Sequence, residues 1–184
     1  MIKGARRSIA VIAAALGVGI GGAVWATSAA SAAPGAPAKP AAVSECTNRQ
    51  VAVWVSPDRA NGAAGSIYYP LDFTNVSSRT CFLVGWPGVS ATNQGGAQLG
   101  SAAQRDSSVP RKVVTIAPGA SAHAVLRYVD VQIDPTAGCR QKTATFLKVF
   151  APDQSKFNQA FFDNAVCSVK GRIYMTISRI EPGA

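Results

Sequence analysis

Four cysteines are the residues with the most definite chemistry in this sequence. Cys46, Cys81, Cys139 and Cys167 lie dozens of residues apart, and no Cys-x-x-Cys pair occurs. Zinc ligands and redox-active pairs are spaced more closely, so both uses are disfavoured. An even number of cysteines in an exported chain instead indicates two disulfides, with three pairings open. We favour Cys46 with Cys81 and Cys139 with Cys167, because each bond then closes a moderate loop within one half of the chain.

A hydrolase would have to use His123, the single histidine, or a pair of carboxylates. A serine–histidine–aspartate relay needs an imidazole buried beside a nucleophile and oriented by an acid. His123 falls on the outward side of a predicted strand, no Gly-x-Ser-x-Gly elbow is present, and none of the nine acidic residues stands in a catalytic motif. We therefore expect no enzymatic activity. An extracellular hydrolase using His123 or a carboxylate pair is the alternative.

Metal ligands are sparse. Asp130 and Asp134 flank a predicted turn and offer a weak calcium site, but a full oxygen cage needs more carboxylates than this loop supplies. One histidine and one methionine after the leader, Met175, make binding of soft metals improbable. The sequence predicts no metal and no cofactor.

Trp54, Trp86 and Tyr68 are the candidate binding residues. Trp86 precedes a Pro-Gly pair at the end of a predicted strand, and Trp54 and Tyr68 lie on the outward sides of theirs. Aromatic side chains concentrate at binding hot spots, so these residues indicate a contact surface for an envelope protein or a glycan. The structural alternative is that Trp86 covers the core and shields a neighbouring disulfide.

Short strands must position these side chains, because apolar residues recur at every second position. Val51, Val53 and Val55 share one face of the first segment. In residues 67–74 one face is apolar and the other includes Pro70, which has no N–H to donate and so predicts an edge strand or a bulge. Residues 81–89 combine an apolar run, a Gly-Trp-Pro-Gly corner and a restart of extended chain, which is typical of a buried strand and a forced turn.

Further segments complete an all-β pattern. Residues 157–162 fit either one helical turn or a strand, and residues 134–138 form a predicted turn. Eight or nine short strands with two disulfides predict an antiparallel immunoglobulin-like β-sandwich, with a barrel as the alternative. The other expected strands cover residues 99–106, 112–116, 122–129, 145–150 and 173–180.

Residues 1–32 have the layout of a secretory signal peptide. Lys3, Arg6 and Arg7 precede an uncharged, mostly apolar run, and a small-x-small site predicts cleavage near Ala32 and Ala33. The paired arginines also raise the twin-arginine export route. An uncleaved leader would be a membrane anchor, the one case in which we expect membrane contact. Residues 33–43 are an Ala/Pro-rich linker, and residues 44–184 are the expected folded domain of a secreted protein.

The charge of the chain argues against nucleic-acid binding. The formal net charge is +9, and without the three basic residues of the leader it is +6. The remaining basic residues are scattered, and only Arg111 and Lys112 are adjacent. Nucleic-acid binders usually concentrate basic residues on one face and interleave them with aromatic residues. A basic surface of this kind attracts anionic polymers or membranes without specificity.

Several segments together resemble the actinobacterial domain of unknown function 4232. They are Gly-Ala-Ala-Gly-Ser at 62–66, Leu-Asp-Phe-Thr-Asn at 71–75, Cys-Phe-Leu-Val-Gly-Trp-Pro-Gly-Val-Ser at 81–90 and Ile-Ala-Pro-Gly-Ala-Ser-Ala at 116–122. The resemblance covers residues 46–180 and implies an exported or lipid-anchored bacterial β-sandwich. It implies no activity. Lipoprotein members carry a lipobox cysteine, which this chain does not have.

Overall fold

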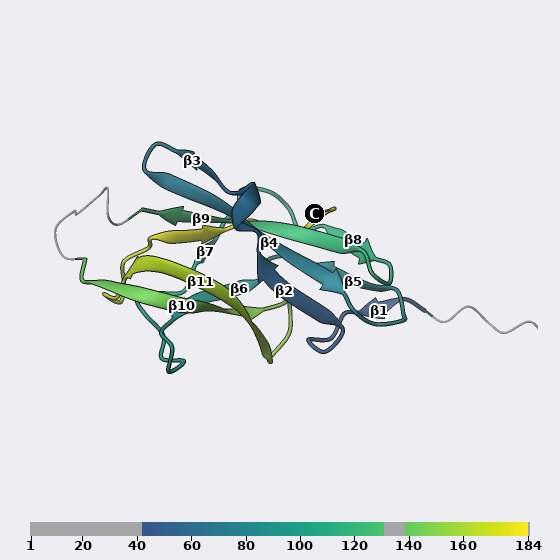
Figure 1. Cartoon of the computed structure of the whole chain (residues 1–184). Coiled ribbons are helices and arrows are strands. Elements are labelled where there is room, and N and C mark those ends of the chain that lie inside the picture. The colour runs from purple at the N-terminus through teal and green to yellow at the C-terminus, as the bar shows by residue number, and fades with distance from the viewer. Residues whose placement is uncertain (1–41, 131–138, 184) are drawn as a thin grey trace, which may run out of the picture. The chain divides into compact units, whose positions relative to one another are not determined.

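The computed structural model describes residues 42–130 and 139–183, and this part of the chain is built from strands (Figure 1). Its strands are β1 (Ser44–Glu45), β2 (Val51–Val55), β3 (Asn61–Ala63), β4 (Ser66–Asn75), β5 (Cys81–Val84), β6 (Gly88–Thr92), β7 (Gln104–Arg105), β8 (Val113–Ile116), β9 (Ser121–Val129), β10 (Gln141–Phe150), β11 (Phe157–Cys167), β12 (Met175–Ile177) and β13 (Glu181–Pro182). One 3-10 turn, η1 (Pro57–Arg59), follows β2. The predicted all-β class is confirmed.

The strands of the described residues form three hydrogen-bonded sheets. The largest has the order β2-β4-β9-β12-β7, with β3 also on β4 and β13 also on β9. The second has the order β11-β10-β6 and the third β1-β5-β8. Pairing is antiparallel except at two short strands, since β1 runs parallel to β5 and β7 runs parallel to β12.

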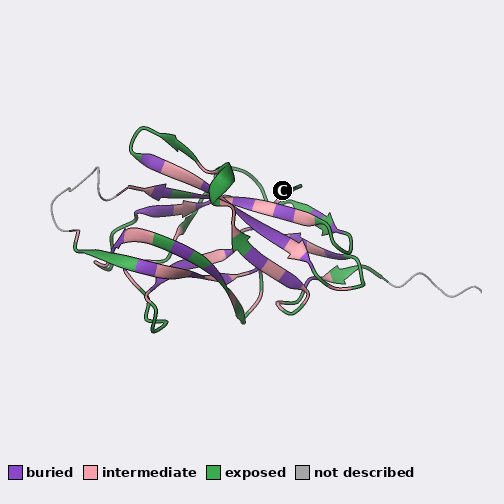
Figure 2. Cartoon of the chain, in the orientation of Figure 1, coloured by how far each residue is buried: buried purple, intermediate pink, exposed green. Residues whose placement is uncertain are grey.

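The core lies between the largest sheet and the β11-β10-β6 sheet, as a sandwich requires. Phe162 of β11 meets Tyr69 of β4 and Tyr128 of β9 edge to face, with ring centroids 5.4 and 5.8 Å apart. Buried and exposed residues alternate along the strands that line this core (Figure 2). On β9 the buried positions are Ala122, Ala124, Leu126 and Tyr128, the face that the sequence predicts.

The stretch 81–89 folds as the sequence predicts. Cys81–Val84 is the middle strand of its sheet, and Leu83 is fully buried. Gly85 then turns the chain with φ +100°, a value that side chains disfavour, and its carbonyl accepts the N–H of Ile180. Strand β6 begins at Gly88 and carries the chain into the second sheet.

Two disulfides are present, with the favoured pairing. Cys46 is bonded to Cys81, which ties the segment before β2 to β5, and Cys139 is bonded to Cys167, which ties the start of β10 to the end of β11. Bonds of this kind persist outside the reducing cytoplasm. Within the described residues no helix is long and apolar enough to cross a membrane. The predicted signal peptide and all but the last two residues of the linker lie outside the described residues.

Strand β4 corrects the prediction from Pro70. It is an internal strand, with β9 on one side and β2 and β3 on the other. The carbonyl of Pro70 accepts the N–H of Ser56, just beyond the end of β2, so this residue faces the break between β2 and β3. Because the N–H and C=O of a strand residue point to the same side, the missing donor of proline would face the carbonyl of Ser56. That carbonyl accepts the N–H of Arg59 in η1 instead, so the proline leaves no acceptor unsatisfied.

Three other segments refine the predicted elements. Residues 157–162 are not a helical turn but the first half of β11. The expected strands at 99–106 and 173–180 shrink to Gln104–Arg105 and Met175–Ile177. The predicted turn at 134–138 lies outside the described residues.

Candidate binding surface

A hollow opens between β2 and β11, at the seam between the largest sheet and the β11-β10-β6 sheet. Near the start of both strands the side chain of Asn158 closes the seam, because its Nδ2 donates to the carbonyl of Val51 at 2.7 Å. Farther along the two strands, the hollow has a volume of about 360 Å³ and lies between Trp54 and Val55 on one side and Phe161 on the other. A concave, mostly apolar site with a few polar groups is the usual form of a ligand pocket.

The inner wall of this hollow is aromatic and firmly packed. Tyr69 and Phe162, both buried, line it and are in edge-to-face contact. The hydroxyl of Tyr69 donates to Oδ1 of Asn164 at 3.3 Å. Burial raises the pKa of Tyr69, so its hydroxyl stays protonated and remains a donor at neutral pH.

The rim of the hollow exposes two aromatic rings. Trp54 is 42% exposed and Phe161 is 67% exposed, although both side chains are large and apolar. Asp163 and Asn164 add hydrogen-bonding groups at the same rim. The arrangement therefore combines exposed aromatic rings with hydrogen-bonding groups.

A buried carboxylate fixes the loop beside Trp54. Asp72 pairs with Trp54 in the β2–β4 ladder and is almost fully buried. Its Oδ2 accepts from the hydroxyl of Ser56 and forms an ion pair with Arg59. These bonds hold η1 against β4, and η1 contributes Pro57 to the hollow. The sequence does not reveal Asp72, because it stands on the alternating face that was expected to be exposed.

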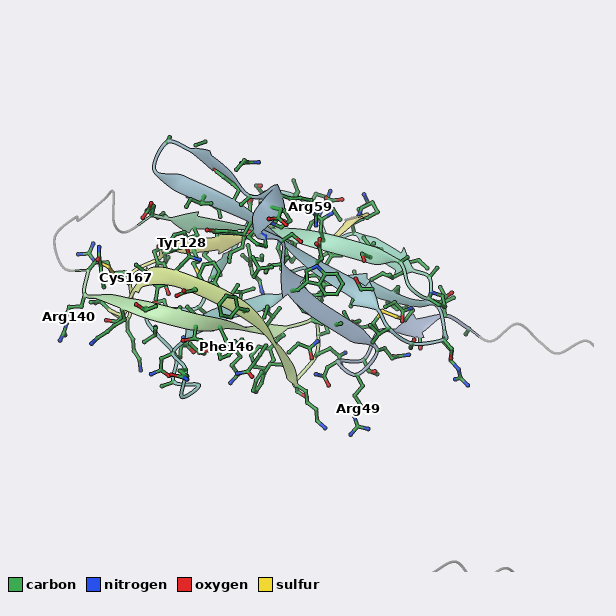
Figure 3. All side chains as sticks on the ribbon, in the orientation of Figure 1. Arg49, Arg59, Tyr128, Arg140, Phe146 and Cys167 are labelled. Carbon is green, nitrogen blue, oxygen red and sulfur yellow. A yellow bond between two sulfur atoms is a disulfide. The ribbon has the colours of Figure 1, made fainter. Side chains whose placement is uncertain are left out.

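Phenylalanine side chains cover the outer face of the neighbouring sheet. Phe146 and Phe150 of β10 pair with Phe161 and Phe157 of β11, and both pairs stack edge to face, at 6.3 and 5.8 Å. The ammonium of Lys148 lies 4.3 Å from the ring centre of Phe157. We call Phe146, Lys148, Phe150, Phe157 and Phe161 the phenylalanine face, and Figure 3 labels Phe146 on it. Because Phe161 also lines the hollow, the two are continuous.

The phenylalanine face was not predicted from the sequence, although the sequence contains a pattern that indicates it. In each of two segments, two phenylalanines flank one polar residue on the same side of a strand. These are Phe146, Lys148 and Phe150 in one segment, and Phe157, Gln159 and Phe161 in the other. The second run was open to a helical interpretation, and the pairing of the two runs is visible only in the folded chain.

The three predicted binding residues do not share one site. Trp54 lines the hollow described above. Tyr68 lines a separate hollow on the outer side of the large sheet, with Arg127 and Thr176. Trp86 is half-buried, and its indole N–H donates to the carbonyl of Asp106 at 2.6 Å.

The other candidates for chemistry are placed as follows. His123 is half-buried and its Nδ1 lies 2.9 Å from the carbonyl of Gly183. Ser56 donates to Asp72 directly, so the hydrogen bonds do not run in the serine–histidine–aspartate order. Asp134 of the weak calcium site lies outside the described residues. Among the described residues no three His, Cys, Asp or Glu side chains gather as metal ligands would.

Fold and surface together define a disulfide-bonded β-sandwich with an exposed aromatic surface. The model of the family Domain of unknown function (DUF4232) matches residues 46–174, and the chain belongs to this family. No curated protein matches the chain, and no solved structure does.

Proposed function

We propose that this protein is a secreted, non-enzymatic binding module of the cell envelope, and that it holds a glycan in the hollow between Trp54 and Phe161. The observation that carries the proposal is the exposure of these two rings on either side of one hollow. Burying both rings against a ligand would remove apolar surface from water, which is the main favourable contribution to association.

A glycan fits the chemistry of the hollow. The axial C–H groups of a pyranose ring form apolar faces that stack on aromatic rings, while its hydroxyls need donors and acceptors at the edge. Trp54 and Phe161 supply ring faces, and Asp163 and Asn164 supply polar groups beside them. The packed wall of Tyr69 and Phe162 is in place before binding, so little ordering is required when a ligand arrives.

The test is a binding titration of the protein, expressed with its own leader, against glycans released from a bacterial envelope. Trp54→Ala and Phe161→Ala should each weaken binding about tenfold or more, which corresponds to about 1.4 kcal/mol. Both residues are exposed, so these variants should keep the fold, which circular dichroism checks.

Two control variants test whether the loss of binding is specific to the hollow between Trp54 and Phe161. Ile173→Ala removes another exposed apolar side chain, and Trp86→Phe removes the indole N–H bond to Asp106. Both should bind like the wild type. Unchanged binding in Trp54→Ala and Phe161→Ala, or no binding to any envelope glycan, would contradict the proposal.

The same samples test the hydrolase alternative. A hydrolase would release reducing ends from the glycan, and His123→Ala would stop the release. We expect no products from the wild type. Turnover that depends on His123 would show that the protein is a hydrolase and would contradict the proposal of a non-enzymatic binding module.

A further inference from the structure

We propose that the phenylalanine face extends the glycan site and selects chains that carry negative charge, such as polyuronic acids. This inference rests on the proposed function and adds the class of ligand. The pyranose rings lie on Phe161 and Phe146, and carboxylates reach the cations gathered around Phe157.

Three basic residues lie in the region of Phe157, at one end of the face. Lys148 lies over the rings of Phe157 and Phe150, at 4.3 and 5.4 Å from their centres. Lys156 precedes Phe157 in the chain, and Arg49 lines a shallow hollow together with Lys156. Figure 3 shows the side chain of Arg49 extending away from the ribbon.

Within the part of the chain that the structure describes, none of these three cations forms an ion pair with a carboxylate. Ion pairs are formed instead by Arg59, Arg111, Lys112 and Arg179. Asp153, the acid nearest to Lys156 in sequence, pairs with Arg111 at 2.7 Å. A ligand with carboxylates would therefore meet positive charge that the described acidic side chains leave uncompensated.

The same cations argue against a second copy of the chain as the occupant. In a two-fold interface each patch meets itself. Lys148, Lys156 and Arg49 of one copy would then lie close to the same cations of the other, and like charges brought together in an interface are costly.

A glycan is favoured over an anionic membrane because the face leads into a hollow. The hollow of about 360 Å³ begins at Phe161 and has Asn164 at its rim, so it offers space and hydrogen bonds for one ring of a chain. A flat lipid surface would use the exposed rings but would leave this hollow empty.

The experiment compares polygalacturonate with its fully methyl-esterified form, the same chain without its charges, using the protein expressed with its own leader. Polygalacturonate should bind about tenfold more tightly than the ester, and added NaCl should weaken only the charged chain. Lys148→Gln should lower the affinity for polygalacturonate about tenfold and leave the ester unchanged. Lys170→Gln is the matched control, because Lys170 is exposed and follows the opposite end of β11 from Phe157.

The outcomes separate this inference from the proposed function. If the ester binds as tightly as the acid, Lys148→Gln changes neither and Trp54→Ala weakens both, the charge selection is wrong and the glycan site stands. If neither chain binds, the inference is overturned, and the envelope glycan titration decides the proposed function. Binding to phosphatidylglycerol vesicles with the same dependence on Lys148 would replace the glycan with a membrane.

Discussion

At the scale of single residues, the buried Tyr174 should make the stability of the fold depend on pH in the alkaline range. Its ring is buried against Tyr128, and its hydroxyl donates to the carbonyl of Leu99 at 3.1 Å. Burial raises the pKa of Tyr174, and the neighbouring Tyr128 raises it further. In the unfolded chain a tyrosine has a pKa of about 10. The unfolded state therefore loses its proton first, and stability is lost as pH rises above about 10.

Tyr174→Phe should change this profile in two ways. At pH 7 the variant should be less stable by about 1 kcal/mol, because the hydrogen bond to Leu99 is lost. Between pH 8 and pH 11 its urea midpoint should fall less than that of the wild type. The fall should not vanish, because the pKa of Tyr69 is also raised by burial. An alkaline loss equal to that of the wild type would show that Tyr174 does not titrate as described.

Asp72 shows why part of the candidate site could not be predicted from the sequence. Alternation places it opposite Leu71 and Phe73, which predicts exposure, yet it is 3% exposed. It is covered because η1 folds back over β4 and brings Arg59 and Ser56 to its carboxylate. Periodicity reports which face of a strand a residue occupies, but not what later packs onto that face.

At the scale of elements, Gly100 joins the chain before β7 to the end of β11. It has φ +64°, and an added Cβ would collide with the carbonyl oxygen of Cys167. Gly100→Ala should therefore lower the free energy of unfolding by about 2–4 kcal/mol. Gly119→Ala is the control, because Gly119 has φ +75° but open space around its Cβ. It should lose only about 1 kcal/mol from backbone strain. Equal losses in urea unfolding would remove the packing argument.

The strands themselves were largely predictable from the sequence, but their pairing was not. The valines of β2 and the apolar positions of β9 face the core as alternation requires. On β10, however, Ala144 and Leu147 are both fully buried, and the register with β11 shifts between Ala144 and Phe146. A shift of this kind changes which residues face outward. The phenylalanine face depends on it and could not be inferred from period two alone.

At the scale of the whole molecule, the disulfides are expected to stabilise both halves of the sandwich. Their partners are 35 and 28 residues apart, so the chain-entropy model gives roughly 3–4 kcal/mol for each bond. Peptide mapping without reduction, on the protein expressed with its own leader, should join Cys46 to Cys81 and Cys139 to Cys167. A free thiol or an exchanged pair would contradict the arrangement.

Fold class and family could be predicted from the sequence, because the strands are marked by local alternation and the family model matches one continuous stretch, residues 46–174. The candidate site was not, apart from Trp54. Its two walls come from β2 and β11, about a hundred residues apart, and Asn158 bridges to Val51 across the seam between them. A single sequence contains no signal for a contact of this kind.

The proposed binding site runs along the seam from β2 across β11 to β10. The most direct measurement is a map of amide and indole NMR shifts in the ¹⁵N-labelled protein during titration with polygalacturonate. If ligands bind there, the largest changes should fall on the indole N–H of Trp54 and on the amides of Phe146, Lys148 and Phe161. Changes confined to the opposite surface around Tyr68 and Arg127, or no changes at saturating ligand, would contradict it.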